Sequence, residues 1–393
     1  MTGLSDPVVS SGVRMEPPTA SPGGRARWTI NGDFLALAPY GVARYALELT
    51  SALDALVTAG HPLARRVDLD LVAPRPAPDW LDLKGIPVRV VPEFGRPRLP
   101  QVWVQVQLPR HVPGGLVSFC NLAPVAVRRQ IVCIHDLQTR TMPDSYGAGF
   151  RLAHRLILPL LGRRVRRVTT VSRESLEHLV GYGVAPREKI SVTHNGSDHV
   201  RRWDGARSSL PLPEDGPYVF ALGRRQPHKN LDLILDLAPL LDAVGIAVLI
   251  AGEVDAAFIA RHGRPVPPNV HLVGRIGDDD VRRALEHALA FLLPSRSEGF
   301  GIPAVEAMAC GCPVVASTSP CLPEICGEAA VYADPDDPAA WRDAVVWLRA
   351  SERERHRLVQ AGHQAAASYS WSRIAEQYLA LMTAVDDEET VGC

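Results

Sequence analysis

The chain has 393 residues, of which 46% are hydrophobic and 22% are charged, and its formal net charge is −1. At roughly 150 residues per domain, this length predicts two or three domains, and the composition excludes a largely disordered chain. The near-zero net charge gives no reason to expect nucleic acid as a partner, and the seven cysteines lack the spacing of a disulfide framework or a zinc site.

Both ends of the chain are expected to be flexible tails. Residues 1–26 are rich in Gly, Pro and Ser and lack the apolar run of a signal peptide. Residues 386–393 carry an acidic run that we expect to fray. No segment approaches the ~20 apolar residues of a membrane span. With cysteines that favour a reducing compartment, these features predict a cytoplasmic protein.

Short apolar runs rich in β-branched residues alternate with helix-length segments along the whole chain. Runs that are apolar throughout are typical of strands buried on both faces, and their alternation with helical segments predicts parallel α/β sheets. In the first half these runs are 27–32, 67–74, 88–93, 115–120, 130–136, 167–172 and 190–196. In the second half they are 218–223, 247–252, 270–274, 290–294, 313–317 and 329–333.

A polar segment rich in Pro and Gly, residues 201–217, separates the two halves and is interpreted as a linker. We therefore predict one domain over residues 27–205 and a second over 206–369. Each is long enough for a doubly wound sheet, and ligands of such sheets lie beyond the carboxyl ends of the strands. Two sheets that face each other would share one cleft. Residues 370–385 place four apolar side chains on one helix face.

The segment 151–167 combines six arginines and one histidine with an apolar centre. It is either an ordinary surface helix whose apolar face packs on the sheet, or a helix that lies on an anionic membrane surface. Both interpretations stay open at this point. The second would give the protein a peripheral contact with the inner face of a membrane.

The segment SRSEGFGIPAVEAMACGCPVVAS, residues 295–317, contains two glutamates separated by seven residues. The apolar run before it is a predicted strand, and a helix is predicted from Pro303 to Cys310. Glu298 then lies in the loop and Glu306 about one turn into the helix, so they do not share a helix face. One interpretation is purely structural: an early helical glutamate that complements the helix dipole.

The other interpretation is a ligand site. A helix amino terminus attracts anions, and glycines at positions 299 and 301 let the backbone approach a ligand closely. A nucleotide sugar fits such a site, with the diphosphate at the helix end and hydroxyl groups on either side. A carboxylate that accepts a hydroxyl hydrogen bond contributes about 1.5–3 kcal/mol.

A second loop, RRQPHKN, follows the strand at 218–223 and carries Arg224 and Lys229. Arginine can bind a phosphate with two donors, and lysine adds a point charge. A solvated loop is the alternative. If the two loops leave one sheet edge, both reach the same diphosphate.

These segments resemble glycosyltransferase family 4, the group 1 glycosyltransferases, which are retaining enzymes of GT-B fold. The resemblance rests on SEGFGIPAVEAMACGCPVVAS, ALGRRQPHKNLD and LPEICGEAAVYADPDD in the second half, and on NGDFLALAPYGVARYALEL, IHDLQTRTMPDSY, VTTVSRESLEHLVGYG and KISVTHNGSD in the first. It covers roughly residues 27–382. It implies two Rossmann-like domains that face a cleft, with the helix at 370–385 crossing back to the first.

The resemblance also implies roles for residues of the second domain. Glu298 would contact hydroxyls of the donor sugar and Glu306 those of the ribose. Arg224 and Lys229 would neutralise the diphosphate. The remaining donor-site positions are Gly223 after the first strand of that domain, Arg275 and Ile276 at the nucleobase, and Gly299, Phe300, Gly301 and Ile302 at the sugar and phosphate.

In the first domain the resemblance implies an acceptor side with Tyr40, Gly41, Arg44 and His135. His135 would lie near the transferred sugar and join Arg224, Lys229 and Glu298 as a catalytic residue, although a buried structural histidine at a strand end is the alternative. The resemblance departs at Tyr40 and Gly41, where the family often has adjacent glycines, so it does not fix the acceptor-side geometry.

The predicted reaction transfers a hexosyl group, with mannosyl as the favoured candidate, from a GDP- or UDP-sugar to a hydroxyl of a glycan, polysaccharide or lipid-linked acceptor. No metal or other cofactor is expected, because protein cations face the diphosphate. The alternatives are a sugar-phosphate synthase or phosphorylase of the same fold, or a non-catalytic nucleotide-sugar binder. An NAD-dependent oxidoreductase is disfavoured, because APYGVARY lacks the G-x-G-x-x-G pattern.

Overall fold

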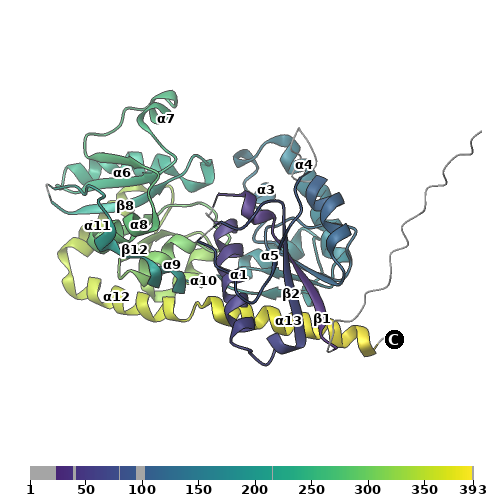
Figure 1. The fold of residues 1–393 in the computed structure, drawn as a ribbon. Coiled ribbons are helices and arrows are strands. Elements are labelled where there is room, and N and C mark those ends of the chain that lie inside the picture. Colours follow the sequence, from purple (N-terminus) through teal and green to yellow (C-terminus); the bar gives the residue numbers. More distant parts are fainter. Residues whose placement is uncertain (1–23, 39–40, 79, 94–101, 215, 392–393) are drawn as a thin grey trace, which may run out of the picture.

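The computed structural model describes residues 24–38, 41–78, 80–93, 102–214 and 216–391 (Figure 1). Two parallel β-sheets, each covered by helices, make up its two halves. Two consecutive helices run beneath them, α12 (Glu352–Ala367) under the second half and α13 (Trp371–Val391) under the first. Most of the expected tail at 1–26 and the residue Tyr40 lie outside the described residues.

The first sheet has seven parallel strands in the order β3-β2-β1-β4-β5-β6-β7. All seven strands match the apolar runs predicted in the first half. Their bounds are β1 Ala26–Asn31, β2 Val67–Ala73, β3 Val88–Val90, β4 Gly115–Ser118, β5 Gln130–Cys133, β6 Arg167–Thr170 and β7 Ile190–Val192. The order reverses direction after β1, which is the doubly wound arrangement that puts ligands beyond the carboxyl ends of the strands.

The second sheet has six parallel strands in the order β10-β9-β8-β11-β12-β13. Their bounds are β8 Tyr218–Gly223, β9 Ala247–Gly252, β10 Val270–Gly274, β11 Ala290–Leu293, β12 Val314–Ser317 and β13 Ala330–Ala333. The central strands β11 and β12 are buried throughout, as expected for strands covered on both faces. Here the direction reverses between β8 and β11, so this sheet also has a ligand edge.

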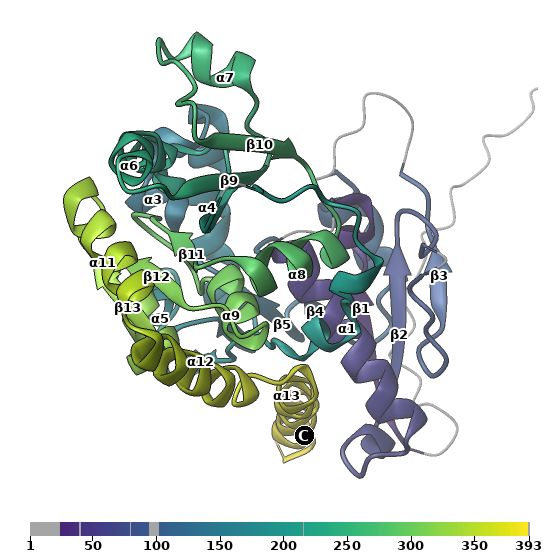
Figure 2. The same cartoon turned by 90° about the vertical axis from the view of Figure 1, so that its left-hand side faces the viewer.

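Twelve described α-helices connect and cover the strands. Their bounds are α1 Val42–Thr58, α3 Gln138–Thr141, α4 Ala148–Arg164, α5 Arg173–Gly181, α6 Leu231–Asp242, α7 Ala256–Arg261, α8 Asp278–His287, α9 Ile302–Ala309, α10 Cys321–Cys326, α11 Pro338–Ala350, α12 Glu352–Ala367 and α13 Trp371–Val391. Two short 3₁₀ turns, Asp198–Arg202 and Pro227–Lys229, also position residues of the site. Figure 2 shows α8 and α9 beside α1 of the first half.

One hydrophobic core cluster extends from the first sheet through α13 into the second. The helix α13 packs on α1, β1 and β2, and the buried Tyr378 hydroxyl forms hydrogen bonds with Tyr45 (3.0 Å) and Thr169 (2.5 Å). Burying one large apolar side chain contributes about 1.5–3 kcal/mol. The returning helix therefore couples the two halves through packing as well as through the chain connection.

The prediction of a frayed tail over residues 386–393 is wrong for the described part of that segment. The helix α13 continues to Val391. Its acidic end faces the amino-terminal edge of the first sheet, where Asp386 accepts a hydrogen bond from Trp28 Nε1 and pairs with Arg129. The acidic run is ordered because arginines lie opposite it, and these distant partners were not apparent in the local sequence.

Candidate active site

The loop after β11 ends at a left-handed glycine that begins α9. Gly301 has φ 90° and ψ 45°, and a Cβ there would lie 2.7 Å from Leu322 Cδ2, so only glycine fits. The helix begins at Ile302, one residue before the predicted start. As expected, Glu298 lies in the loop and Glu306 within the helix, and both residues are buried.

Glu298 is held by Lys229, which comes from the 3₁₀ turn after β8. The Lys229 ammonium donates to both carboxylate oxygens of Glu298 at 2.8 Å. Burial opposes ionisation of Glu298, but the adjacent lysine outweighs it and lowers the pKa of this carboxyl. The two predicted loops do meet at one sheet edge, and Glu298 is an ionised hydrogen-bond acceptor at neutral pH.

Glu306 has different partners. Its Oε1 accepts a hydrogen bond of 2.9 Å from Nε2 of the fully buried His199, and the Trp371 indole N–H donates to the other ring nitrogen at 3.0 Å. This network assigns the neutral tautomer with the proton on Nε2. The start of α13 thus orients His199, and His199 orients Glu306.

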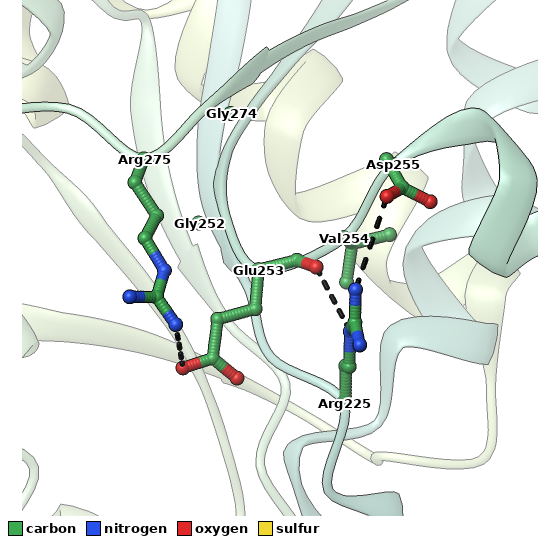
Figure 3. Close-up of a pocket in the computed structure, with 7 residues that line it drawn as sticks. All are labelled: Arg225, Gly252, Glu253, Val254, Asp255, Gly274 and Arg275. Atoms are coloured by element: carbon green, nitrogen blue, oxygen red, sulfur yellow. Dashed lines mark hydrogen bonds and ion pairs between the residues drawn. The ribbon is translucent and has the colours of Figure 1, made fainter.

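A pocket of about 270 Å³ lies at the carboxyl ends of β8, β9 and β10 (Figure 3). Its central side chain is Glu253, whose Oε1 accepts from Arg224 at 3.1 Å and from Arg275 at 3.4 Å. Arg225 donates to the Glu253 carbonyl at 3.0 Å. The predicted nucleobase residue Arg275 lines this pocket, whereas Ile276 packs against the main hydrophobic core.

Two glycines end the strands β8 and β9 beside this pocket, and one of them, Gly252, lines it. A Cβ at Gly223 would lie 2.7 Å from Ile250 Cγ2, and a Cβ at Gly252 would lie 2.3 Å from the Gly223 carbonyl oxygen. The ends of β8 and β9 therefore approach more closely than side chains would allow. This leaves the strand ends open to a ligand.

His135 follows β5 and is buried in the first domain. Its Nε2–H donates to the Phe119 carbonyl at 2.7 Å, and its ring contacts Tyr45 edge to face. Its main chain, in contrast, faces the second domain: a Cβ at Gly299 would lie 3.4 Å from the His135 carbonyl oxygen and 3.0 Å from Asp136 Oδ2. The strand end after β5 and the loop after β11 therefore meet across the cleft.

The predicted acceptor-side residue Arg44 reaches across the cleft to the second domain. It lies on α1, donates to both carboxylate oxygens of Asp278 at 3.1 Å and 2.6 Å, and comes within 3.8 Å of Glu306 Oε1. Because α1 faces α8 and α9, its guanidinium reaches the carboxylates of the second domain. Gly41 precedes α1 with φ 53°, which explains the glycine at that position.

Three further contacts connect the domains across the cleft. Gln138 Nε2 donates to the Ser297 carbonyl at 3.2 Å, and His228 forms a hydrogen bond of 2.8 Å with the Ser145 hydroxyl. Burial, and then the charge of Lys229, lowers the pKa of His228 to about 4, so this imidazole is neutral at physiological pH. Glu324 accepts from His194 Nε2 at 3.0 Å.

Sequence reasoning missed four site residues. Asp136 was signalled by IHD, in which only the histidine was chosen, and Glu253 lies directly after the strand AVLIAG. His199 and Glu324 had no local signal, because their partners Glu306 and His194 are distant in sequence. His199 and Glu324 became visible only when the fold brought them to these partners.

The described residues contain no cluster of three or more His, Cys, Asp or Glu side chains that could hold a metal ion. Asp68 and Asp70 of β2 form ion pairs with Arg27 and Arg89 respectively. The expectation that no metal is required stays a prediction.

Residues 204–365 match the family model described as "Glycosyl transferases group 1". Among curated relatives, the O-antigen chain mannosyltransferase RfbU of Salmonella typhimurium is 27% identical over 225 residues. The match covers 56% of this chain and 60% of that protein, which is less than two thirds of its length.

Solved structures share the whole architecture. The sucrose-phosphate synthase of Thermosynechococcus elongatus aligns over 93% of this chain and 100% of its own, with a TM-score of 0.70 and 18% identity. The Anabaena protein HepE, solved with UDP and glucose, aligns over 92% of this chain and 100% of its own, with a TM-score of 0.64 and 17% identity. At this identity the likeness concerns the fold, and the predicted GT-B fold is confirmed.

Proposed function

Residues 204–365 match the model of the group 1 glycosyltransferases, and on this premise we propose that the chain is a retaining hexosyltransferase of that family. It moves a sugar from a nucleoside diphosphate to an acceptor hydroxyl. In this proposal residues 27–205 bind the acceptor and residues 206–369 bind the donor. The returning helix over 370–385 belongs with the acceptor domain.

One observation carries the proposal: the Lys229–Glu298 pair joins two strand ends of one sheet beside the amino terminus of α9. A cation, a helix end and a buried acceptor are the groups that a sugar diphosphate requires. Arg224 adds a second cation at the same edge. The diphosphate then lies between them, and the ribose reaches Glu306.

The chemical step breaks the bond between the anomeric carbon and the phosphate oxygen and forms a bond from that carbon to the acceptor oxygen. The acceptor proton goes to the departing phosphate, and attack occurs on the same face, so the anomeric configuration is retained. Arg224, Lys229 and the start of α9 stabilise the negative charge that develops on the diphosphate. Glu298 orients the sugar by accepting its hydroxyl hydrogens, and His135 and Asp136 face the same region from the acceptor domain.

A mannosyl group is our candidate for the transferred sugar, supported by the RfbU similarity. For the base, GDP and UDP are the two candidates, and the HepE complex is named with UDP. The nucleobase would lie in the pocket around Glu253 and Arg275. A thermal-shift screen of nucleotide sugars tests this directly, with the larger stabilisation expected from the correct base.

The acceptor is a glycan or a lipid-linked glycan, and we place the reaction in the cytoplasm. A peripheral membrane contact through residues 151–167 belongs to the same proposal, because it would bring the site to a lipid-linked acceptor. Within the described part of the chain, no helix is long and apolar enough to cross a bilayer.

The two glutamates provide the test of the assigned roles. Glu306→Ala is expected to weaken binding of the free nucleoside diphosphate by roughly 10- to 100-fold, since a charged hydrogen bond contributes about 1.5–3 kcal/mol. Glu298→Ala is expected to leave that binding nearly unchanged and to slow transfer. Calorimetry with free nucleotide and chromatography of nucleotide released from the sugar donor measure the two effects. Equal loss of nucleotide affinity in both variants would contradict the assignment, and binding without any release would indicate a non-catalytic binder.

A further inference from the structure

We propose that α4 and the basic pocket at its carboxyl end form a docking surface for an anionic phospholipid bilayer, and that the acidic end of α13 competes for this pocket. The basic pocket lies at the opposite end of the first sheet from the cleft, whereas α4 begins three residues after Ser145, which contacts His228 across the cleft. The purpose of this surface, delivery of a lipid-linked acceptor, rests on the proposed function. The binding of this surface to anionic lipid does not depend on the proposed function.

The first observation is an exposed apolar row on α4. Leu152, Leu156 and Leu160 are 59%, 59% and 49% exposed, and their spacing of four residues puts them on one helix face. The helix packs inward through other side chains, including Leu158 and Leu161, which are buried. It is therefore a surface helix with a second apolar face that no described residue covers. In Figure 1, α4 lies at the outer edge of the first half.

The second observation is a pocket of about 530 Å³ at the end of this row. Its lining cations come from the end of α4, the segment before β5, the start of β6 and the residue before β7: Arg128, Arg129, Arg163, Arg164, Arg166, Arg167 and Lys189. Of these, Arg128 and Arg163 form no ion pair with any described residue. The site therefore has positive charge in excess of its internal counter-charge.

The third observation is that two carboxylates of α13 partly neutralise the cations of this pocket. Glu388 and Glu389 complete the pocket lining. Glu389 pairs with Arg129 at 3.3 Å and with Arg166 at 3.1 Å, and Glu388 pairs with Arg167. The side chain of Glu389 is 31% exposed and that of Glu388 is 48% exposed, so an external anion can compete with them. A phospholipid phosphate has the charge and acceptor oxygens to replace these carboxylates.

Leucines beside arginines favour a bilayer over nucleic acid. A helix that presents leucine with flanking arginine inserts its apolar face at the headgroup boundary, and the cations bind anionic headgroups. Each basic residue near the surface strengthens binding about fivefold. Three exposed leucines in a row would not contribute to binding the phosphate backbone of a nucleic acid.

Co-sedimentation of the full-length protein with phosphatidylcholine vesicles, with and without phosphatidylglycerol, tests the proposal. Binding is expected only with phosphatidylglycerol and is expected to fall with salt. Arg128→Gln with Arg163→Gln is expected to weaken it by about 25-fold, from two such residues, and Leu156→Ser with Leu160→Ser by at least tenfold. Thermal melts identify any variant that fails to fold.

Glu388→Gln with Glu389→Gln is the decisive variant, because it is expected to strengthen vesicle binding severalfold. Its matched control is Asp242→Asn with Glu352→Gln, which adds the same charge at exposed sites of the second half and is expected to change binding little. If both pairs of substitutions strengthened vesicle binding equally, net charge alone would explain the effect, and the proposed competition by the acidic end of α13 would be overturned.

Three other outcomes overturn the docking surface: no binding to anionic vesicles, binding unaffected by the leucine changes, or tighter binding to duplex DNA than to vesicles. Inhibition of vesicle binding by millimolar inorganic phosphate with no leucine dependence would assign the pocket to a free phosphate instead. Nucleotide release from a sugar donor in solution is expected to be the same in all these variants. A failure of the docking surface is therefore distinguishable from a failure of the proposed transferase activity.

Discussion

The two glutamates of the segment 295–317 have separate partners, and this divides their roles at the residue scale. Glu298 is bound by Lys229, and Glu306 by His199. A carboxylate already fixed by a neighbouring donor keeps a free lone pair in a set direction, so it loses little entropy when a ligand hydroxyl binds. The site is therefore organised before the donor arrives.

Gly299 provides a prediction at this scale. A methyl group there would lie 3.0 Å from Asp136 Oδ2 and 3.4 Å from the His135 carbonyl oxygen, which opposes approach of the two domains. Gly299→Ala is expected to lower kcat by roughly 10- to 100-fold, since small displacements of reacting groups have effects of that order. Affinity for free nucleotide, measured by calorimetry, is expected to stay within about threefold.

The matched control is Gly181→Ala at the end of α5, where an added Cβ meets nothing within 4 Å. It is expected to behave like the unmodified protein. If both substitutions reduce kcat equally, or if Gly299→Ala has no effect, the close approach of the two strand ends is not part of the catalytic state.

At the scale of elements, α5 of the first half begins against α10 of the second. The Glu324 carboxylate accepts from the backbone N–H groups of Arg173 and Glu174, at 2.9 Å and 3.4 Å, so it caps a helix of the other domain. Burial, opposed by a backbone hydrogen bond from Cys321 and reinforced by the charge of Glu324, raises the pKa of Glu174 to about 7. Two carboxylates near one helix end do not both ionise easily.

This raised pKa predicts a pH dependence of stability. The pKa of Glu174 rises from 4.5 to about 7 on folding, so the folded state holds this proton more tightly than the unfolded state. The stabilisation is complete below about pH 4.5 and is lost as the pH rises through about 7. Glu174→Gln is expected to raise Tm at pH 8, by a few degrees at most because the group is partly solvated, and to leave Tm at pH 5 unchanged.

Glu177→Gln is the control for this measurement, since Glu177 lies on the same helix but its pKa is lowered by the Arg187 hydrogen bond. It is expected to give no gain at pH 8. A Tm gain for Glu174→Gln that is the same at pH 5 and pH 8 would rule out the raised pKa as its cause.

Elements were predictable from the sequence to the extent that their signals are local. Buried apolar runs located all thirteen strands, and Pro303 and Gly311 located the two ends of α9 to within one residue each. Residues whose roles depend on distant partners were not predictable. The pairing of Arg44 with Asp278 was not predicted, and in the segment 386–393, which was expected to fray, Asp386 pairs with Arg129. In each case the oppositely charged partner lies more than 200 residues away in the sequence.

On the scale of the whole molecule, hydrogen bonds and ion pairs join the two domains across the cleft. Arg44–Asp278, Gln138–Ser297 and His194–Glu324 each join one side to the other. Individually such partly exposed pairs contribute little, about 0–1 kcal/mol for an ion pair. They are therefore weak enough to open for ligand exchange and to close again over a bound donor.

Small-angle X-ray scattering tests this closure. Saturating donor is expected to lower the radius of gyration of the protein, because the bound diphosphate adds contacts that exist only when the cleft is closed. Arg44→Ala, which removes one cross-cleft pair, is expected to raise the radius of gyration of the free protein. An unchanged radius with saturating donor would remove support for closure.

The most direct test of retaining sugar transfer is real-time proton NMR of the protein with its donor sugar nucleotide and an alcohol or glycan acceptor. We expect release of nucleoside diphosphate together with a first-formed product whose anomeric configuration equals that of the donor, and a large loss of both signals in Lys229→Gln. A product of inverted configuration, or a donor that binds and is never consumed with any acceptor, would contradict it.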